Sequence, residues 1–316
     1  MTKRILMHWP SLNLSVNATL ADDKNPELCQ DIWNALPIES VMSNAVITGG
    51  SMYCWAPILS YAPLRYKEAI DKAPIGRLRY SQGTGNKIIV QYDKCHEDVM
   101  GTVLGEVDAE DIPTIQAIGS KALQSIFLSK QPLYIRISRL EEGAAQEARQ
   151  PQVNHLGLSP EAVDLVQRIM TEALAANKAE TQEHKNMRTG RNKDIGSFGQ
   201  YFSTWEFVYS MLRDLSMYTL YPLAKMSHRE NIDLRQLCET YMEMVPQYTN
   251  LLGSYGMFTL RNFTREFEKL IKEKELSRKD VIAIIEALTI YTNCLSAWAY
   301  FYYPWGIGNF FRFPEE

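Results

Sequence analysis

The sequence predicts an α+β protein in which an N-terminal β-barrel is followed by an all-α helical bundle. Residues 1–142 contain many short apolar runs of strand length, which turn residues separate and two brief helices interrupt. Residues 158–316 instead repeat apolar side chains at helical spacing and are rich in Tyr and Met. We therefore expect a barrel domain (1–142), a linker (143–157) and a bundle (158–316).

The first elements of the barrel follow from side-chain periodicity. Apolar and polar residues alternate from position 12 to position 20, which is typical of a half-buried strand. Residues 27–36 then place Leu28, Ile32 and Leu36 on one stripe of a short helix that Pro37 ends.

The remaining barrel elements are short. The apolar runs predict strands at 43–47, 52–55, 77–80, 87–92 and 102–107. Gly83, Gly85 and Asn86 tolerate positive φ and predict a hairpin turn between two of these strands. A helix over 111–128 and a closing strand near 133–137 complete a partly closed barrel.

The bundle is predicted from apolar seams and capping residues. Ser159 and Pro160 begin the first helix, and Ser277 with Asp280 forms a start resembling a capping box for the last. Pro222 is expected to break a long aromatic helix over 198–226. With helices over 234–252 and 260–275, the seams predict a bundle of about five helices.

Composition restricts the function classes. The net charge of -4 and the pI near 5.8 argue against a general nucleic-acid binder. The five cysteines are scattered and never in C-x-x-C spacing, which indicates reduced thiols in a cytoplasmic protein without a metal site. The apolar stretch 281–305 contains Glu286 and Asn293, so we expect a buried helix and no membrane span.

The usual catalytic motifs are absent from the sequence. It contains no G-x-G-x-x-G after a strand, no G-x-x-x-x-G-K-[ST], no H-E-x-x-H and no G-x-S-x-G elbow. Hydride transfer, phosphoryl transfer and Ser-His-Asp hydrolysis therefore lack sequence support.

Polar and aromatic residues on barrel strands are the candidate site residues. Ser51, Tyr53 and Trp55 alternate on one strand face and either line a ligand site or pack in the core. Tyr92 ends another strand and has the same two interpretations. Glu106 follows an apolar run, where a carboxylate is either partly desolvated, which suits a general base, or outward and solvated.

Titratable and basic side chains add further candidates. His8 on the first strand and His96 in a charged loop are either proton shuttles or solvated histidines. The planar guanidinium of arginine can donate two hydrogen bonds to one carboxylate, so each basic residue is either a carboxylate contact or a solvated surface residue. The basic residues form two clusters, Arg65, Lys67, Arg77 and Arg79 near the barrel strands and Lys185, Arg188, Arg191 and Lys193 between helices.

Several strand phrases carry a resemblance to a known family. They are Leu36-Pro37-Ile38-Glu39-Ser40-Val41, Met52-Tyr53-Cys54-Trp55-Ala56-Pro57-Ile58, Gly76-Arg77-Leu78-Arg79-Tyr80 and Gly101-Thr102-Val103-Leu104-Gly105-Glu106-Val107. The barrel resembles cyclophilin-like proteins, but the Arg, Phe, Gln and His set of proline isomerases is not found at matching positions. The barrel and bundle together resemble the cucumopine/mikimopine synthases, which form opines.

The resemblance implies an enzyme that condenses L-histidine with 2-oxoglutarate by a Pictet–Spengler cyclisation, as a lyase or synthase without a cofactor. It implies acid–base groups, for which Glu106, His8, His96 and Tyr53 are the candidates. It also implies carboxylate and imidazole contacts, expected from Ser51, Trp55, Arg65, Arg77, Arg79, Tyr92 and Arg191.

Two alternatives remain open from the sequence. The chain is otherwise a non-catalytic binding or scaffold protein whose Tyr/Met-rich bundle serves as an oligomer interface. A related Pictet–Spenglerase that uses another aromatic amino acid is the second alternative. In each enzymatic interpretation the partners are small molecules, with neither nucleic acid nor membrane, and a homo-oligomer remains open.

Overall fold

The computed structural model describes residues 2–45, 47–143, 156–191 and 204–302. The chain divides into two compact units. The barrel unit holds residues 1–149 together with 300–316, and the helical unit holds residues 150–299. Most of the predicted linker (143–157) lies outside the described residues.

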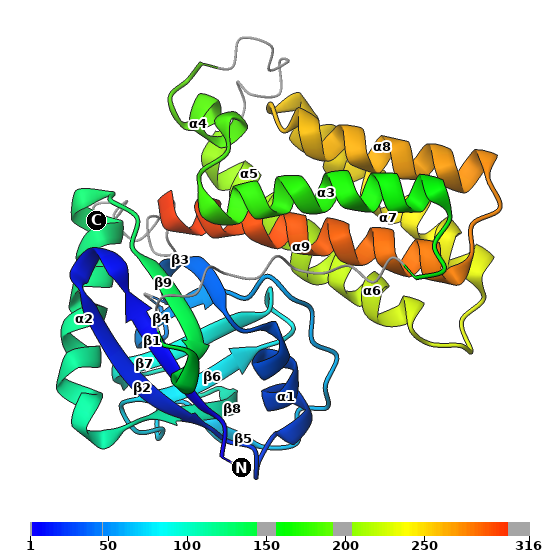
Figure 1. The fold of residues 1–316 in the computed structure, drawn as a ribbon. Coiled ribbons are helices and arrows are strands. Elements are labelled where there is room, and N and C mark those ends of the chain that lie inside the picture. Colours follow the sequence, from blue (N-terminus) through cyan, green and yellow to red (C-terminus); the bar gives the residue numbers. More distant parts are fainter. Residues whose placement is uncertain (1, 46, 144–155, 192–203, 303–316) are drawn as a thin grey trace, which may run out of the picture. The chain divides into compact units, whose positions relative to one another are not determined.

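The described residues of the barrel unit form nine antiparallel strands (Figure 1). The strands are β1 (Arg4–Trp9), β2 (Leu14–Leu20), β3 (Ile38–Asn44), β4 (Gly49–Trp55), β5 (Lys67–Ala69), β6 (Arg77–Ser81), β7 (Lys87–Cys95), β8 (Met100–Val107) and β9 (Tyr134–Arg139). Their order is β2-β1-β9-β3-β4-β7-β6-β8-β5, and an additional β2–β8 pairing closes eight of them into a ring. The predicted barrel is confirmed, and it is closed where the sequence predicted partial closure.

Strands β4, β6 and β7 are buried on both faces of the sheet. Met52 and Cys54 of β4 and Leu78 and Tyr80 of β6 belong to the apolar core. The residues between them point to the opposite face of the sheet. On β4, β6 and β7 that opposite face is also buried, although it carries polar side chains: Ser51, Arg77, Arg79, Lys87 and Gln91.

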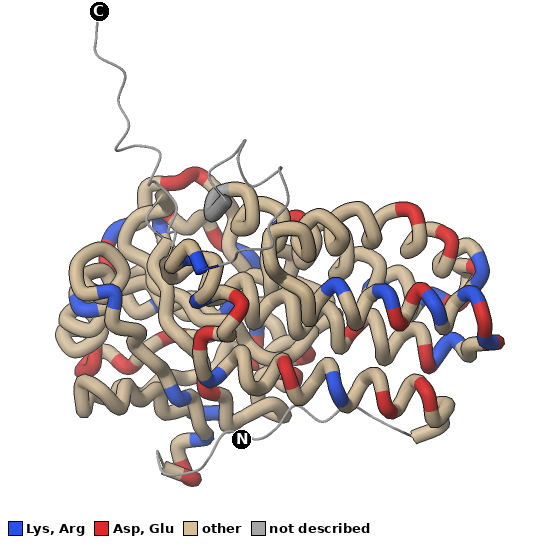
Figure 2. The backbone as a smooth tube through the Cα atoms, turned by 90° about the horizontal axis from the view of Figure 1, so that it is seen from above, with Lys and Arg blue, Asp and Glu red and all other residues tan. Residues whose placement is uncertain are grey.

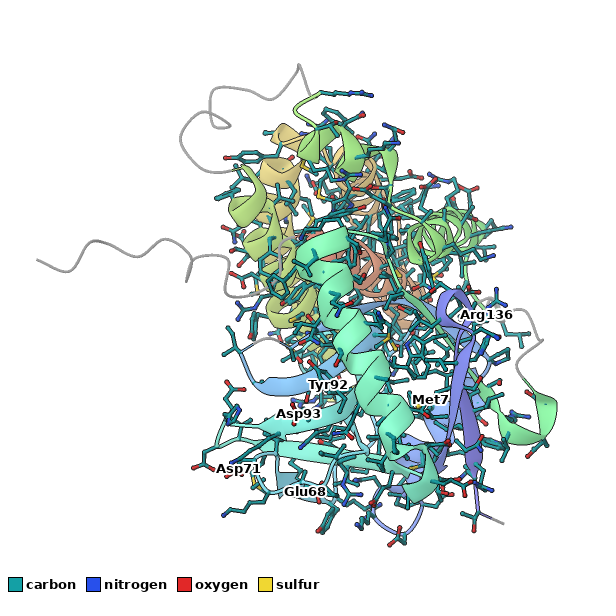
Figure 3. All side chains as sticks on the ribbon, turned by 90° about the vertical axis from the view of Figure 1, so that its left-hand side faces the viewer. Met7, Glu68, Asp71, Tyr92, Asp93 and Arg136 are labelled. Carbon is teal, nitrogen blue, oxygen red and sulfur yellow. The ribbon has the colours of Figure 1, made fainter. Side chains whose placement is uncertain are left out.

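Two helices pack against the barrel core. They are α1 (Pro26–Ala35) and α2 (Ile112–Gln124), and α2 continues into a π-helical turn over Ser125–Ser129. Figure 3 shows α2 lying across the strands beside Tyr92. A Cβ atom on Gly119 of α2 would lie 2.1 Å from the Tyr92 ring, so this approach requires glycine.

The helical unit contains five long helical segments and one short helix among its described residues. They are α3 (Pro160–Lys178), α4 (Gln182–Arg188), α5 (Thr204–Arg213) continuing into α6 (Tyr221–Ser227), α7 (Leu234–Ser254), α8 (Phe258–Glu273) and α9 (Arg278–Tyr302), whose residues 300–302 belong to the barrel unit. Ser159 accepts a hydrogen bond from the Ala162 N–H, which confirms the predicted N-cap. Ser277 and Asp280 bond reciprocally at the start of α9, as the capping box predicts.

The predicted break at Pro222 is wrong in position. A π-helical segment, Asp214–Leu220, joins α5 to α6, and Pro222 lies within the first turn of α6. Proline has no N–H to donate to the preceding turn. The π segment shifts the hydrogen-bond register immediately before Pro222, so the helix continues through a position where a regular α-helix would be interrupted.

Helix α9 is the one described helix that is long and apolar enough to cross a membrane. Of its apolar window, 83% is buried inside the structure, which is typical of a core helix. Figure 2 shows basic and acidic positions interspersed along the backbone. All five cysteines are free thiols, and among the described residues no group of His, Cys, Asp and Glu forms a metal-binding cluster.

Candidate functional site

The candidate site is the buried polar face of β4, β7 and β6, opposite the barrel core. The strand register places its side chains in rows. Tyr53 of β4 pairs with Ile89 of β7, and Ile89 pairs with Arg79 of β6. Ser51 pairs with Gln91 in the next row, and directly paired residues share one face of a sheet.

Arg79 is the principal cation of this face. The residue is 3% exposed, and its stem passes so close to Gly101 that a Cβ there would lie 2.8 Å from Arg79 Cδ. Nη2 donates to Ser51 Oγ at 2.7 Å and reaches Cys95 Sγ at 3.6 Å. Nε and Nη1 are buried and have no hydrogen-bond partner in the described structure. Among the described residues, the hydrogen bonds of this buried guanidinium therefore go to neutral groups alone.

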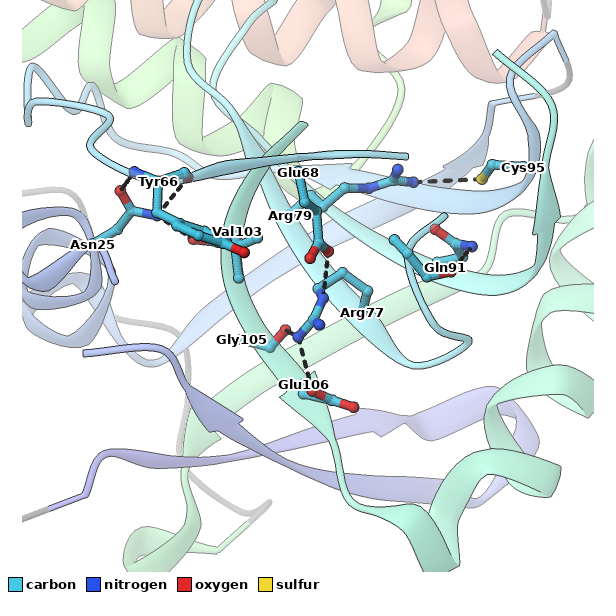
Figure 4. A network of polar contacts seen from close by, with 11 residues as sticks. Asn25, Tyr66, Glu68, Arg77, Arg79, Gln91, Cys95, Val103, Gly105 and Glu106 are labelled. Carbon is cyan, nitrogen blue, oxygen red and sulfur yellow. Dashed lines mark hydrogen bonds and ion pairs between the residues drawn. The ribbon is translucent and has the colours of Figure 1, made fainter. Parts of the chain in front are cut away.

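Arg77, on the same face of β6, has the opposite surroundings (Figure 4). Its Nε donates to Glu68 Oε1 at 2.5 Å and its Nη1 to Glu106 Oε2 at 2.8 Å. The two carboxylates compensate its charge. Arg77, predicted as a substrate-binding residue, is thus already engaged by two anions of the protein.

Lys87 forms the third part of the face, surrounded by aromatic rings. Its Nζ lies 4.9 Å from the ring centres of Tyr53 and Trp55 and 4.7 Å from that of Tyr300. The three rings meet edge to face, with Tyr53 and Trp55 centred 5.2 Å apart. Burial, and next the neighbouring Tyr300, raise the pKa of the Tyr53 phenol far above its ordinary value, so this hydroxyl remains protonated.

The structure brings together Ser51, Tyr53, Trp55 and Arg79 from the predicted set. It separates the other predicted ligand contacts from them. Tyr92 points to the core face of β7, where its hydroxyl accepts a hydrogen bond from Asn44 Nδ2 at 2.9 Å, as in the core interpretation left open by the sequence.

Arg65 is exposed and pairs with Glu27, so its charge is compensated at the surface by the protein's own carboxylate. Arg191 is exposed and lies in the helical unit, after α4.

The predicted acid–base residues Glu106, His8 and His96 lie at exposed or partly exposed positions. Glu106 is on β8 with 52% of its side chain exposed, so the desolvated carboxylate considered from the sequence is not what the structure contains. His8 bonds Ser15 Oγ at 2.8 Å on β1, and its side chain alternates with the buried core residues of that strand. His96 is exposed after β7, and its backbone N–H bonds the Thr48 carbonyl.

Sequence reasoning missed Lys87, Gln91, Glu68 and Tyr300. Lys87 and Gln91 flank the apolar run of β7 at alternate positions, and that spacing was the available signal for Gln91. Glu68 is on a three-residue strand, β5, where it pairs with Gly101 and so shares the face of Arg79. Tyr300 is far from the barrel strands in sequence, and no local pattern connects it with them.

Comparisons with known proteins agree with this architecture. The profile of the family described as "Cucumopine synthase C-terminal helical bundle domain" matches residues 162–301. The solved structure of McbB in complex with tryptophan superposes with a TM-score of 0.87 at 27% identity, covering 98% of this chain and 100% of that one.

Two other results give no support of this kind. A solution structure of a hypothetical protein from Archaeoglobus fulgidus reaches a TM-score of only 0.29 at 14% identity, over 44% of this chain and 95% of that one, and carries no argument. No curated protein matches the sequence.

The fold and these matches define a barrel–bundle enzyme of the Pictet–Spengler synthase type. Residues 162–301 match the cucumopine synthase C-terminal helical bundle model, which confirms the resemblance seen in the sequence.

Proposed function

We propose that this protein condenses L-histidine with 2-oxoglutarate to give cucumopine or its diastereomer mikimopine. The observation that carries the proposal is the guanidinium of Arg79, which is 3% exposed, has two unpartnered nitrogens among the described residues and shares its sheet face with Tyr53. A buried cation of this kind is costly unless an anion binds to it. A carboxylate of the 2-oxo acid fits the two free donors.

The proposed reaction is neutral in redox terms. The histidine amine attacks the ketone carbon, the carbinolamine loses water, and the resulting iminium carbon forms a C–C bond with the imidazole ring. Loss of the ring proton restores aromaticity. No electrons leave or enter, so the chemistry requires proton transfers and positioning. Holding both reactants in attack geometry supplies about 7–11 kcal/mol in favourable cases.

Positive charge and aromatic surface are the groups that this reaction requires. The product carries three carboxylates, for which Arg79 and Lys87 supply two positive charges on one face. Trp55 and Tyr53 offer ring edges and faces to a substrate imidazole. The protonated Tyr53 hydroxyl is a hydrogen-bond donor and not a base.

Glu106 is our choice for the acid–base group. Arg77 holds its Oε2 in place at 2.8 Å, and its half-exposed position allows proton exchange with solvent. Glu68, on the same guanidinium, is the structural alternative, and His8 and His96 remain sequence predictions.

A second candidate substrate is tryptophan. The similar protein McbB was solved in complex with tryptophan at 27% identity over nearly the whole chain. An indole carbon would then replace the imidazole carbon as the nucleophile of ring closure.

Mass spectrometry of the incubated protein tests the proposal. Histidine and 2-oxoglutarate, with no nucleotide or metal added, should give an adduct lighter than their sum by one water. Tryptophan in parallel separates the two candidate substrates. No adduct from either, together with no thermal stabilisation by any of these ligands, would favour the non-catalytic scaffold, because a ligand that binds the native state raises its melting temperature.

A further inference from the structure

Gln91 is a further polar group on this face with an unsatisfied buried atom. It lies on β7, opposite Ser51 of β4, and is 1% exposed. Its Nε2 donates to the Ala73 carbonyl at 3.0 Å. Its Oε1 is buried and has no hydrogen-bond partner in the described part of the chain.

The bond to Ala73 fixes the orientation of the amide. A carbonyl oxygen can only accept, so the atom facing Ala73 must be the NH₂ group and the remaining atom must be the oxygen. Gln91 therefore presents a hydrogen-bond acceptor that the protein itself leaves unused. An unused buried acceptor costs about 1–3 kcal/mol, which a ligand donor would recover.

The neighbouring groups define the donor that suits this acceptor. Ser51 is both the strand partner of Gln91 and the acceptor of the Arg79 hydrogen bond, so Gln91 lies next to the cation. With a carboxylate of the 2-oxo acid on Arg79, the group that suits Gln91 is an N–H donor of the second substrate, held close to the ketone. The α-amino group of an amino acid is such a donor.

We propose that Gln91 Oε1 accepts a hydrogen bond from the α-amino group of the amino-acid substrate and positions it for attack. This inference rests on the proposed function and specifies which atom holds the nucleophile. A neutral amide accepts from either –NH₃⁺ or –NH₂, so it keeps its bond when the amine loses its proton to become nucleophilic. Gln91 is thus a specificity residue for amines over their des-amino analogues.

Calorimetric titration of paired ligands tests this role. L-Histidine is compared with 3-(imidazol-4-yl)propionate, which lacks only the amine, and L-tryptophan with indole-3-propionate. The wild-type protein should bind the cognate amino acid about 10-fold more tightly than its des-amino analogue. Q91L should lose this difference because it binds the amino acid more weakly and the analogue as tightly as the wild type does. The KM of Q91L for the amino acid should rise by the same factor.

Q82L is the matched control. Gln82 is also buried, and its Nε2 also donates to a loop carbonyl, that of Ala62, at 2.8 Å. Q82L removes the same type of structural bond and should retain the preference for the amine. Q91M provides a second acceptor-free variant in case Q91L does not fold.

The inference is overturned if Q91L or Q91M weakens the binding of the amino acid and of its analogue equally, or if it weakens the binding of neither ligand. In both cases the wild-type protein still makes the product, so the proposed function survives. If the wild-type protein binds no amino acid and forms no adduct, the proposed function and this inference fail together.

Discussion

Arg77 and Arg79 are two residues apart on β6 and face the same side of the sheet, but their environments are opposite. Arg77 donates to Glu68 and Glu106, which compensate its charge. Arg79 is more deeply buried and, among the described residues, its side chain hydrogen-bonds only Ser51 and Cys95. A cation that the protein pairs with its own carboxylates stabilises the fold, whereas a buried cation without an anion is a binding site. We therefore assign Arg77 to structure and Arg79 to the substrate.

Replacing Arg79 should give the largest effect. R79M removes the proposed carboxylate donors and should lower kcat/KM by about 1000-fold, since charge-assisted hydrogen bonds contribute about 1.5–3 kcal/mol each. Stability should be unchanged or higher, because no carboxylate loses a partner. Steady-state kinetics and urea unfolding check both parts. R79K keeps the positive charge but lacks the two-pronged guanidinium, so its kcat/KM should lie between those of R79M and the wild type. An R79M enzyme with normal kinetics would remove the distinction between the two arginines.

Replacing Arg77 should show the reverse pattern. R77M leaves two carboxylates without their cation, and breaking a largely buried pair costs about 3 kcal/mol of unfolding free energy. Urea denaturation of R77M against R77K measures this cost. If R77M were as stable as the wild type but failed to bind 2-oxoglutarate, Arg77 would belong to the site and its assignment to structure would be wrong.

E106Q tests the role of the exposed carboxylate on Arg77. An amide cannot exchange a proton, so kcat should fall by about 100-fold while KM changes little. E68Q is the matched variant, because Glu68 bonds the same guanidinium. Normal turnover in E106Q with slow turnover in E68Q would transfer the base role to Glu68.

Buried His184 in the helical unit tests whether every unpartnered buried atom signals a ligand. Its Nε2 has no partner in the described structure, and burial lowers the pKa of the imidazole from 6.5 to about 4. Between pH 6.5 and about pH 4 the unfolded state binds more protons than the folded state. The contribution of neutral His184 to the free energy of unfolding is therefore fully present above pH 6.5 and is lost as the pH falls toward 4.

The wild type should therefore lose about 2 kcal/mol near pH 5 relative to neutral pH, and H184L should lack this loss. The difference between the two urea-unfolding profiles is the measurement. Parallel profiles would mean that His184 remains accessible to protons when folded, and its unpartnered nitrogen would then need another explanation.

Much of the fold could be predicted from local sequence patterns. The alternation over 12–20, the glycines of the hairpin turn, the Ser159 cap and the Ser277–Asp280 box all act within a few residues, so the sequence shows them directly. Closure of the barrel depends on β2 meeting β8, which are distant in sequence. The π segment before Pro222 depends on helical register, which a proline alone does not reveal.

The site could be predicted only in part for the same reason. Alternation placed Ser51, Tyr53 and Trp55 on one face, and the structure confirms that arrangement. Tyr92 could not be assigned to a face because its strand, β7, is apolar on one face and mixed on the other. The contrast between Arg77 and Arg79 depends on Glu68 and Glu106, which come from two other strands, and no local spacing reveals such a pairing.

Calorimetric titration of 2-oxoglutarate into wild type, R79M and R77K tests the central claim most directly. If Arg79 is the receptor for a substrate carboxylate, binding should be strong in the wild type and in R77K and should disappear in R79M. Equal affinity in R79M and the wild type would contradict the claim.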